Sequence, residues 1–276
     1  MIDMEFNDII AKLPTPYYRD EQADIVIYCA DCRDILPLIP DKSIDLVLTD
    51  PPYGITACEW DIIPDLDRLW AELKRVGGDN CAYVFTTNQP FTTDLINSNR
   101  KWFRYEIIWD RVTGKNPYLA KKMPMKSHDN ILIFYRSQPT YNPQMIKAEK
   151  GNMRDRVKNN TKARENTIYG NIKEYTSKKD ENLRYPTSVF RYSYQNDEVH
   201  YTKRQHPTQK PSELFKYLIE TYSNPRCLIL DPFLGSGTTA YCAKKLNRKC
   251  IGIEIEEKYC EIAAKRLSQS IMKSEV

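Results

Sequence analysis

The stretch "LILDPFLGSGTTAYCAKKLNRKCIGIE", residues 228–254, carries the strongest fold signal in the chain. An apolar strand runs into Asp231, a glycine turn follows at 235–237, a helix begins near Thr238, and a second strand ends in Glu254. Glycines let a ligand approach the backbone, and an acid at the tip of the next strand can accept hydrogen bonds from both hydroxyls of a ribose. The stretch predicts the nucleotide-binding half of a Rossmann-like unit.

Two other interpretations of this stretch remain open at this point. It is compatible with a purely structural strand–turn–helix, because short motifs also occur without a ligand. A nicotinamide dinucleotide site is the second alternative. The third glycine of the G-x-G-x-x-G fingerprint is missing, since Thr239-Ala240 stand in its place, and the sequence offers no candidate for hydride chemistry.

A second stretch, "LVLTDPPYGI" at 46–55, ends an apolar strand with two prolines. Pro51 and Pro52 cannot donate to a strand ladder, and they push the preceding residues toward extended geometry. Asp50 and Tyr53 are therefore expected at the carboxyl end of a buried strand, on a stiff backbone. An ordinary proline-terminated strand is the structural alternative.

Strands and helices alternate along the rest of the chain. The apolar runs predict strands over 25–29, 45–49, 81–86, 103–109, 130–135, 226–230 and 249–253. Helical spacing of apolar residues predicts helices over 65–76, 211–223 and 256–270. This alternation indicates an α/β fold with a mostly parallel sheet and helices on both faces.

The order of the strands indicates a circular permutation. The glycine-turn strand normally comes first in a nucleotide-binding sheet, yet here it comes near the end of the chain. We expect 226–230 and 249–253 to be the first two strands of the sheet, and 25–29 and 45–49 the third and fourth. Acids that follow all these strands then meet at one carboxyl edge, which is where open α/β sheets bind ligands.

Composition limits the class of protein. The 276 residues are 41% hydrophobic and 28% charged, which suits one α/β domain with an insertion. The sequence contains no apolar stretch long enough for a membrane span and no signal region, so a cytoplasmic protein is expected. Cys29 and Cys32 form one C-x-x-C without a second pair, and the 3 histidines are dispersed. We therefore expect reduced cysteines and no metal site.

Positive charge is concentrated in one segment. Residues 147–205 hold 14 Lys and Arg against 8 Asp and Glu, a net charge of +6 in a chain whose total is +4. Basic residues interleaved with tyrosines and amides suit phosphate contact and base reading, although a solvated surface is the usual fate of such a run. A second basic loop lies at 111–126.

Several blocks in a fixed order resemble the β class of DNA amino-methyltransferases. They are "DPPY" at 50–53, "KSHDNILIFYR" at 126–136, "HPTQKP" at 206–211, "DPFLGSGTT" at 231–239 and "GIE" at 252–254. The resemblance covers almost the whole chain. It implies a Rossmann-like sheet, S-adenosyl-L-methionine as methyl donor, duplex DNA as substrate and frequent homodimers, often beside a cognate restriction endonuclease.

The resemblance also implies a division into domains. Residues 1–136 and 206–276 would form the catalytic and donor-binding domain, and 137–205 the inserted target recognition region. From the basic segments we predict DNA contacts by Lys115, Lys121, Lys122, Lys178, Lys179 and Arg184.

Catalytic roles follow from the chemistry of an exocyclic amine. Its lone pair is delocalised into the base ring, so the enzyme must prepare the nitrogen. The Asp50 carboxylate and the Pro51 carbonyl can each accept one N–H bond as positive charge develops, and Tyr53 can stack on the extruded base. The predicted catalytic set is Asp50, Pro51, Pro52 and Tyr53.

The donor site follows from the same logic together with the resemblance. Glu254 would bind the ribose hydroxyls, Asp31 the adenine amine of the donor and Asp231 its methionine ammonium. Thr208 and Lys210 would bind its carboxylate, with a proline-flanked loop as the structural alternative for these two. The predicted donor set is Asp31, Asp50, Thr208, Lys210, Asp231, Phe233, Gly235, Ser236, Gly237, Thr238 and Glu254.

Other activities fit less well. A cytosine carbon-5 methyltransferase would need a Pro-Cys nucleophile, and none of the 17 prolines precedes a cysteine. RNA and protein amide methyltransferases usually show Asn in place of Asp50, with an unpermuted order. A catalytically dead DNA-binding module is the non-enzyme alternative. Within the resembling family, members that modify cytosine mostly carry Ser at this position, so adenine is the expected target and the cytosine amine the alternative.

Overall fold

The computed structural model of the chain describes residues 5–56, 58, 61–147, 165–166, 170–171, 183–193 and 209–269. The chain divides into two compact units, a larger one of Met1–Asn142 with Ser188–Val276 and a smaller one of Pro143–Thr187. The helices are α1 (Phe6–Ile10), α2 (Cys32–Ile35), η1 (Leu36–Leu38), α3 (Leu66–Val76), α4 (Phe91–Ser98), η2 (Pro117–Leu119), α5 (Ser212–Tyr222), α6 (Thr238–Lys245) and α7 (Glu257–Ser268). Of the helices in these described segments, none has the length and apolar character needed to cross a membrane.

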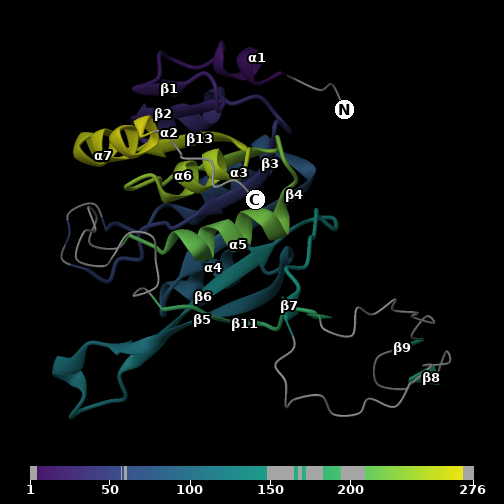
Figure 1. Ribbon diagram of the computed structural model, residues 1–276, viewed down its shortest axis with the longest axis vertical. Coiled ribbons are helices and arrows are strands. Elements are labelled where there is room, and N and C mark those ends of the chain that lie inside the picture. The colour runs from purple at the N-terminus through teal and green to yellow at the C-terminus, as the bar shows by residue number, and fades with distance from the viewer. Residues whose placement is uncertain are drawn as a thin grey trace. The chain divides into compact units, whose positions relative to one another are not determined.

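A nine-stranded sheet forms the centre of the larger unit, in the order β1-β2-β13-β12-β3-β4-β6-β5-β11 (Figure 1). Its strands are β1 (Tyr18–Asp20), β2 (Ile25–Cys29), β3 (Ile44–Thr49), β4 (Gly77–Thr87), β5 (Phe103–Lys115), β6 (Lys126–Phe134), β11 (Val189–Arg191), β12 (Leu228–Asp231) and β13 (Lys249–Glu254). The smaller unit holds two short pairs, β7 (Ile146–Lys147) with β10 (Leu183–Arg184) and β8 (Glu165–Asn166) with β9 (Gly170–Asn171).

The strand order confirms the predicted circular permutation. The glycine-turn strand β12 pairs in parallel with β13 on one side and with β3 on the other. Strand β13 in turn pairs in parallel with β2, and β3 with β4. The two C-terminal strands, β13 and β12, therefore lie side by side between the N-terminal strands β2 and β3, and all four present their carboxyl ends at the same edge. The α/β, mostly parallel fold predicted from the sequence is confirmed.

The far side of the sheet is antiparallel. Strand β6 lies between β4 and β5 and runs opposite to both. Strand β11 adds in parallel to the outer edge of β5. This strand belongs to the segment 137–205, so part of the expected insertion is built into the main sheet, and the smaller unit is confined to Pro143–Thr187.

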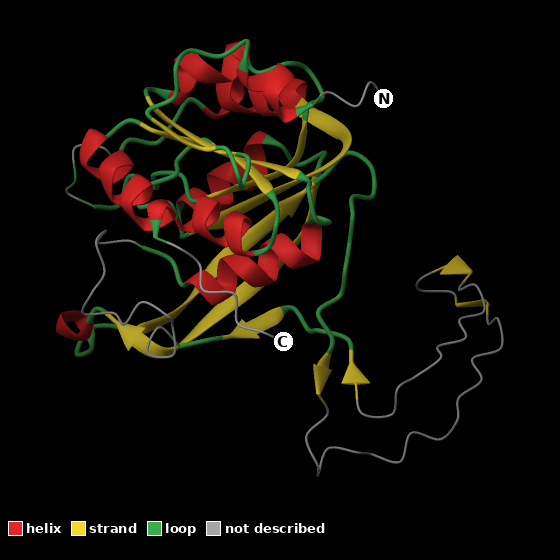
Figure 2. Ribbon diagram, turned by 45° about the horizontal axis from the view of Figure 1, so that its top comes forward, coloured by secondary structure: helices red, strands yellow, loops and turns green. Residues whose placement is uncertain are grey.

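The core lies on both faces of the sheet, as Figure 2 shows by the helices on either side of the strands. Alternate strand residues point to opposite faces, so Val26 and Tyr28 join one cluster while Ile25 and Ile27 join the other. The first cluster is covered by α1–α4 and the second by α5–α7. Because both faces are buried, the central strands are continuous apolar runs, which is the pattern that made them predictable.

An aromatic cluster fills the core under α3. The ring of Trp70 packs against Tyr83, Phe85 and Phe134 with centroid distances of 5.9, 5.3 and 5.0 Å. Its indole N–H donates to the hydroxyl of Ser98 in α4 at 2.9 Å. Aromatic pairs of this geometry each contribute about 0.5–1.5 kcal/mol beyond their buried area. The cluster fixes α3 and α4 against β4 and β6.

Replacing Gly237 with alanine should destabilise the fold. Gly237 has φ +80°, and a Cβ there would come within 2.7 Å of the Cβ of Ala263 in α7. The left-handed conformation costs a residue with a Cβ about 1–2 kcal/mol, and the clash adds to this. We expect Gly237→Ala to lower the free energy of unfolding in urea by at least about 1 kcal/mol. Gly78→Ala is the matched control, because its Cβ would meet only ordinary contacts from 3.5 Å outward; equal losses in both variants would contradict the packing argument.

Candidate active site

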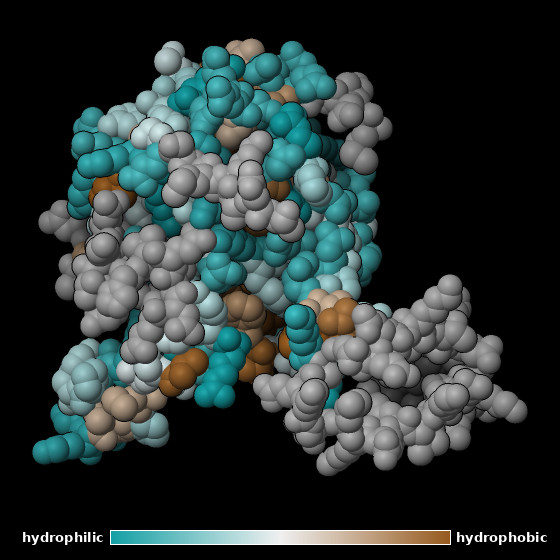
Figure 3. Space-filling view, viewed as in Figure 1, coloured by the Kyte–Doolittle hydropathy of each residue, from teal (hydrophilic) through white to brown (hydrophobic). Residues whose placement is uncertain are grey.

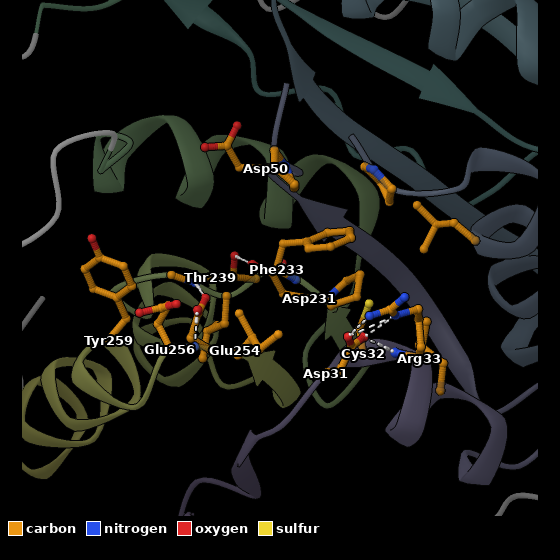
Figure 4. Close-up of a pocket in the computed structure, with 18 of the residues that line it drawn as sticks. Asp31, Cys32, Arg33, Asp50, Asp231, Phe233, Thr239, Glu254, Glu256 and Tyr259 are labelled. Atoms are coloured by element: carbon orange, nitrogen blue, oxygen red, sulfur yellow. Dashed lines mark hydrogen bonds and ion pairs between the residues drawn. The ribbon is translucent and has the colours of Figure 1, made fainter. Parts of the chain in front are cut away.

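A cavity of about 600 Å³ opens at the carboxyl edge of the central strands (Figure 4). Residues that follow β2, β3, β12 and β13 line it together, although they come from opposite ends of the chain. The predicted site residues that line it are Asp31, Asp50, Pro52, Lys210, Asp231, Phe233, Gly235, Ser236, Thr238 and Glu254. Thr208 lies outside the described residues. The strand ends thus bring most of the predicted residues to one place.

Glu254, the last residue of β13, orders the glycine turn. Its carboxylate accepts the backbone N–H of Gly235 at 2.7 Å and that of Glu256 at 2.9 Å. Burial raises the pKa of Glu254, although these N–H bonds oppose the shift. The side chain therefore closes the turn from the cavity side, while each carboxylate oxygen keeps a second lone pair for a hydroxyl donor.

Asp231, the last residue of β12, is buried at the centre of the site. Its carboxylate accepts hydrogen bonds from the Thr49 hydroxyl at 2.6 Å, from the Thr239 hydroxyl and from the Phe233 N–H at 3.1 Å. Burial raises the pKa of Asp231 to about 7, while the two hydroxyl bonds act in the opposite direction. The carboxylate joins β12, β3 and α6, a structural role that the sequence does not reveal.

Gly237 differs from its neighbours in the turn. Among the described residues predicted to hold the donor, it is the one that does not line the cavity. Its α-carbon faces Ala263 of α7 instead. Ser236 and Thr238 are buried beside it, where the Ser236 hydroxyl lies 3.4 Å from the side-chain oxygen of Gln209 and the Thr238 hydroxyl accepts from Arg266 at 3.0 Å. Gly237 therefore serves close packing between the turn and α7.

Asp31, expected to meet an adenine amine, is held by its neighbour Arg33. The carboxylate accepts the Arg33 backbone N–H at 2.8 Å, and the guanidinium forms an ion pair with it. The hydrogen bond from the Arg33 side chain lowers the pKa of Asp31, against the effect of burial. Figure 4 shows this pair on the opposite side of the cavity from Glu254 and Tyr259. Arg33 was not anticipated, and no spacing rule in the sequence marks it.

Asp50 stands above the cavity, at the end of β3. The hydroxyls of Tyr53 and Thr86 both donate to one oxygen of its carboxylate. The ring of Tyr53 stacks against Phe91, with centroids 5.6 Å apart and planes at 28°. Burial raises the pKa of Tyr53 well above its ordinary value, and the charge of Asp50 adds to this, so the phenol stays protonated and acts as a donor.

Lys210 contacts the other oxygen of the Asp50 carboxylate. Its side chain is only 5% exposed, whereas that of Asp50 is 20% exposed. Burial lowers the pKa of Lys210, and the charge of Asp50 opposes this shift. The lysine lies 3.4 Å from the Tyr53 hydroxyl as well. The predicted donor-binding lysine thus contacts the predicted catalytic acid.

Asp61 orders the loop that follows the two prolines. One carboxylate oxygen accepts the N–H groups of Tyr53 and Gly54 at 2.7 and 2.9 Å, and the other accepts those of Ile55 and Thr56 at 2.9 and 2.7 Å. Burial alone would raise the pKa of Asp61, yet a hydrogen bond from the Thr56 side chain, together with these backbone bonds, brings it below the ordinary value. Asp61 was not predicted as a site residue, because no local sequence pattern links it to a turn five to eight positions earlier.

The predicted DNA-contacting residues lie in two places. Strands β5 and β6 continue past the sheet as a hairpin arm, residues 111–126, seen at the lower left of Figure 1. Lys115, Lys121 and Lys122 are exposed on this arm. Exposed hydrophobic residues accompany them, so both kinds of surface alternate there in Figure 3; they are Val112, Tyr118, Met123 and Met125.

The remaining predicted DNA contacts belong to the other unit or are not described. Arg184 is an exposed residue of β10 in the smaller unit. Lys178 and Lys179 lie outside the described residues. Wherever the structure describes the chain, it contains no group of three or more His, Cys, Asp or Glu side chains arranged to hold a metal, and Cys29 and Cys32 are free thiols.

Replacing Asp61 with asparagine should release the loop that follows the prolines. An amide keeps one acceptor oxygen and places an NH₂ group against two backbone N–H donors. Since hydrogen bonds to charged groups contribute about 1.5–3 kcal/mol each, the amides of residues 53–56 should exchange with deuterium at least about tenfold faster in Asp61→Asn. Asp67→Asn, an exposed acid in α3, is the control. Unchanged exchange at these four amides would contradict the role of Asp61.

Known proteins resemble this chain in sequence. The profile of a family described as DNA methylase, covering N6 and N4 amino-methyltransferases, matches residues 44–265. The type II methyltransferase M1.MboII of Moraxella bovis is 31% identical over 258 residues, which cover 88% of this chain and 96% of that protein. M.ScaI of Streptomyces caespitosus is 28% identical, and the match covers 96% of this chain and 88% of that protein.

Solved structures share the fold. The cytosine-N4-specific PvuII DNA methyltransferase superimposes with a TM-score of 0.67 at 16% identity, over 95% of this chain and 92% of that one. The complex of M1.HpyAVI with S-adenosylmethionine gives a TM-score of 0.59 at 22% identity, over 89% of this chain and 100% of that one. The family match over residues 44–265 and the 31% identity to M1.MboII show that the chain belongs to the DNA methylase family, whose members transfer a methyl group from S-adenosyl-L-methionine to an exocyclic amine of adenine or cytosine in DNA.

Proposed function

We propose that this protein methylates the exocyclic amine of adenine in duplex DNA, after the target base has left the helix. The position of Asp50 carries the proposal. Its carboxylate stands at the end of β3, on the backbone stiffened by Pro51 and Pro52, directly over the cavity formed by the glycine turn. An acceptor held in this way can meet an N–H group of a base while the methyl donor lies below it.

The chemistry of the cavity fits the donor. A volume of about 600 Å³ suits a nucleoside linked to an amino acid. Glu254 offers acceptors for the ribose hydroxyls, Asp31 for the adenine amine and Asp231 for the methionine ammonium, while Lys210 offers a cation for the carboxylate. Phe233 forms part of the cavity wall, and the backbone of Gly235 lets the donor approach closely. When bound, the donor supplies an electrophilic sulfonium methyl group.

The residues of the chain prepare the amine for transfer. Asp50 and the Pro51 carbonyl would each accept one N–H bond of the target amine, which stabilises the positive charge that develops on nitrogen. Stacking of the base on Tyr53 would offset part of the few kcal/mol that unstacking and unpairing cost. The contacts of Tyr53 with Phe91 and of its N–H with Asp61 hold the ring in one orientation for this purpose.

Replacing Asp50 with alanine should nearly abolish methyl transfer. Loss of a catalytic hydrogen-bonding group typically costs about 10²–10³ in kcat, and DNA affinity should survive because phosphate contacts dominate it. Transfer of labelled methyl groups to DNA measures the first quantity, and a filter-binding titration the second. Asp34→Ala, an exposed acid in α2, serves as the control. Near-normal turnover in Asp50→Ala would remove Asp50 from the mechanism.

Adenine and cytosine compete as targets, because both carry an amine conjugated to a ring nitrogen. Asp50 favours adenine, since members of the family that modify cytosine mostly carry Ser there. Likeness of fold does not distinguish adenine from cytosine as the target, because the cytosine-N4-specific PvuII enzyme shares the fold. The alternative is therefore transfer to the cytosine amine.

The target base can be identified directly. Unmodified DNA is treated with the purified protein and S-adenosyl-L-methionine, digested to nucleosides and analysed by mass spectrometry. We expect N6-methyl-2′-deoxyadenosine and no methylated cytosine. Methyl groups on the cytosine amine would overturn the choice of base while leaving the Asp50 mechanism in place, and sequencing of the methylated DNA would then report the recognised site.

DNA is proposed to lie along the basic surfaces. The lysines of the hairpin arm, Lys115, Lys121 and Lys122, suit phosphate contact, and residues 137–205, which include Arg184, Lys178 and Lys179, are the proposed target recognition region. The relatives are named type II methyltransferases, which supports a cognate restriction endonuclease as partner. A homodimer remains the oligomeric state that we propose from the family resemblance.

A further inference from the structure

We propose that Lys210 couples donor binding to target-base binding by moving between two carboxylates. Without the donor, its ammonium binds Asp50; when the donor is present, the ammonium turns to the donor carboxylate, and the released oxygen of Asp50 accepts the target amine. This inference rests on the proposed function, because it takes Asp50 as the acceptor of the amine. It assigns Lys210 as a positioning residue that acts through Asp50.

A buried ammonium needs an anionic partner. The Lys210 side chain is 5% exposed, and an unpaired charge at such a site is costly. Among the described residues, the carboxylate that pairs with Lys210 is that of Asp50. In this structure the ion pair with Asp50 supplies that anion.

Both carboxylate oxygens of Asp50 already accept hydrogen bonds. The hydroxyls of Tyr53 and Thr86 both bind one of its oxygens, and Lys210 binds the other. The ammonium adds the Coulombic attraction of a full positive charge to its hydrogen bond, so a neutral base amine competes poorly with it for the same oxygen. An adjacent cation would also oppose the positive charge that develops on the amine during transfer.

Lys210 also lines the cavity proposed for the donor. Asp50, Lys210 and Gln209 all contribute to its wall, and the side-chain oxygen of Gln209 lies 3.4 Å from the hydroxyl of Ser236 in the glycine turn. The lysine thus lines the same cavity as Asp50. Its four-carbon stem lets the ammonium reach a second acceptor without movement of the backbone.

A double-mutant cycle on ligand binding tests the coupling without DNA. Calorimetry compares S-adenosylhomocysteine, which carries the amino-acid carboxylate, with methylthioadenosine, which lacks it. Asp50→Asn removes the competing carboxylate, so Lys210 is released for the ligand. We expect Asp50→Asn to bind S-adenosylhomocysteine about tenfold more tightly than the wild type does, and methylthioadenosine equally well.

The second arm of the cycle separates Lys210 from simple charge repulsion. In Lys210→Gln the gain from Asp50→Asn should fall to less than about twofold, because no ammonium remains to be shared. Repulsion between Asp50 and the ligand carboxylate would persist in that background. Lys216→Gln, a lysine of α5 that pairs with Glu213, is the charge-matched control and should keep the full gain. Unchanged binding of methylthioadenosine shows that each variant is folded.

Two results would overturn the inference. One is an equal effect of Asp50→Asn on both ligands, and the other is the same gain with and without Lys210. Either would leave the methyl-transfer assay of Asp50→Ala unaffected, so failure of the coupling is distinguishable from failure of the proposed function. If the wild type binds neither ligand, the coupling and the proposed donor site both fail.

Discussion

The site depends on the hydrogen bonds that the buried carboxylate of Asp231 accepts. It accepts the hydroxyl of Thr49, 182 residues away at the end of β3, and that of Thr239 in the first turn of α6. A buried carboxylate is tolerated only when donors surround it, so both threonines are held to it. Because β3 leads into Asp50 and α6 follows the glycine turn, this one group aligns the two halves of the cavity.

Two further carboxylates, those of Glu254 and Asp61, order loops by accepting backbone N–H groups. Glu254 closes the glycine turn, and Asp61 holds the four successive amides that follow the prolines. Asp50 differs from Glu254 and Asp61, because its donors are side chains. A side chain can exchange hydrogen-bond partners at a lower cost in free energy than a backbone can. The ordered loops therefore surround an acceptor whose partners are able to change, which suits a residue that must bind a substrate group.

Much of the fold was predictable, because the central strands are buried on both faces and appear as unbroken apolar runs. Their ends are marked by an acid, a proline or a glycine, so Asp50, Asp231 and Glu254 were expected at one edge, and the cavity brings them together. Strand β11 and residue Asp61 were not expected. β11 is three residues long without a periodic pattern, and Asp61 acts through a loop whose geometry no spacing rule describes.

The sequence by itself determined the class of the sheet, its permuted order and the blocks that form the site, because apolar runs mark the buried strands and the glycine-turn strand stands near the end of the chain. Only the tertiary structure decided which donor satisfies which buried carboxylate. Lys210 and Asp50 are 160 residues apart, and their contact follows from how α5 and β3 pack. Pairing of buried charges depends on distances of a few ångströms between such segments, and these distances are set by the packed core as a whole.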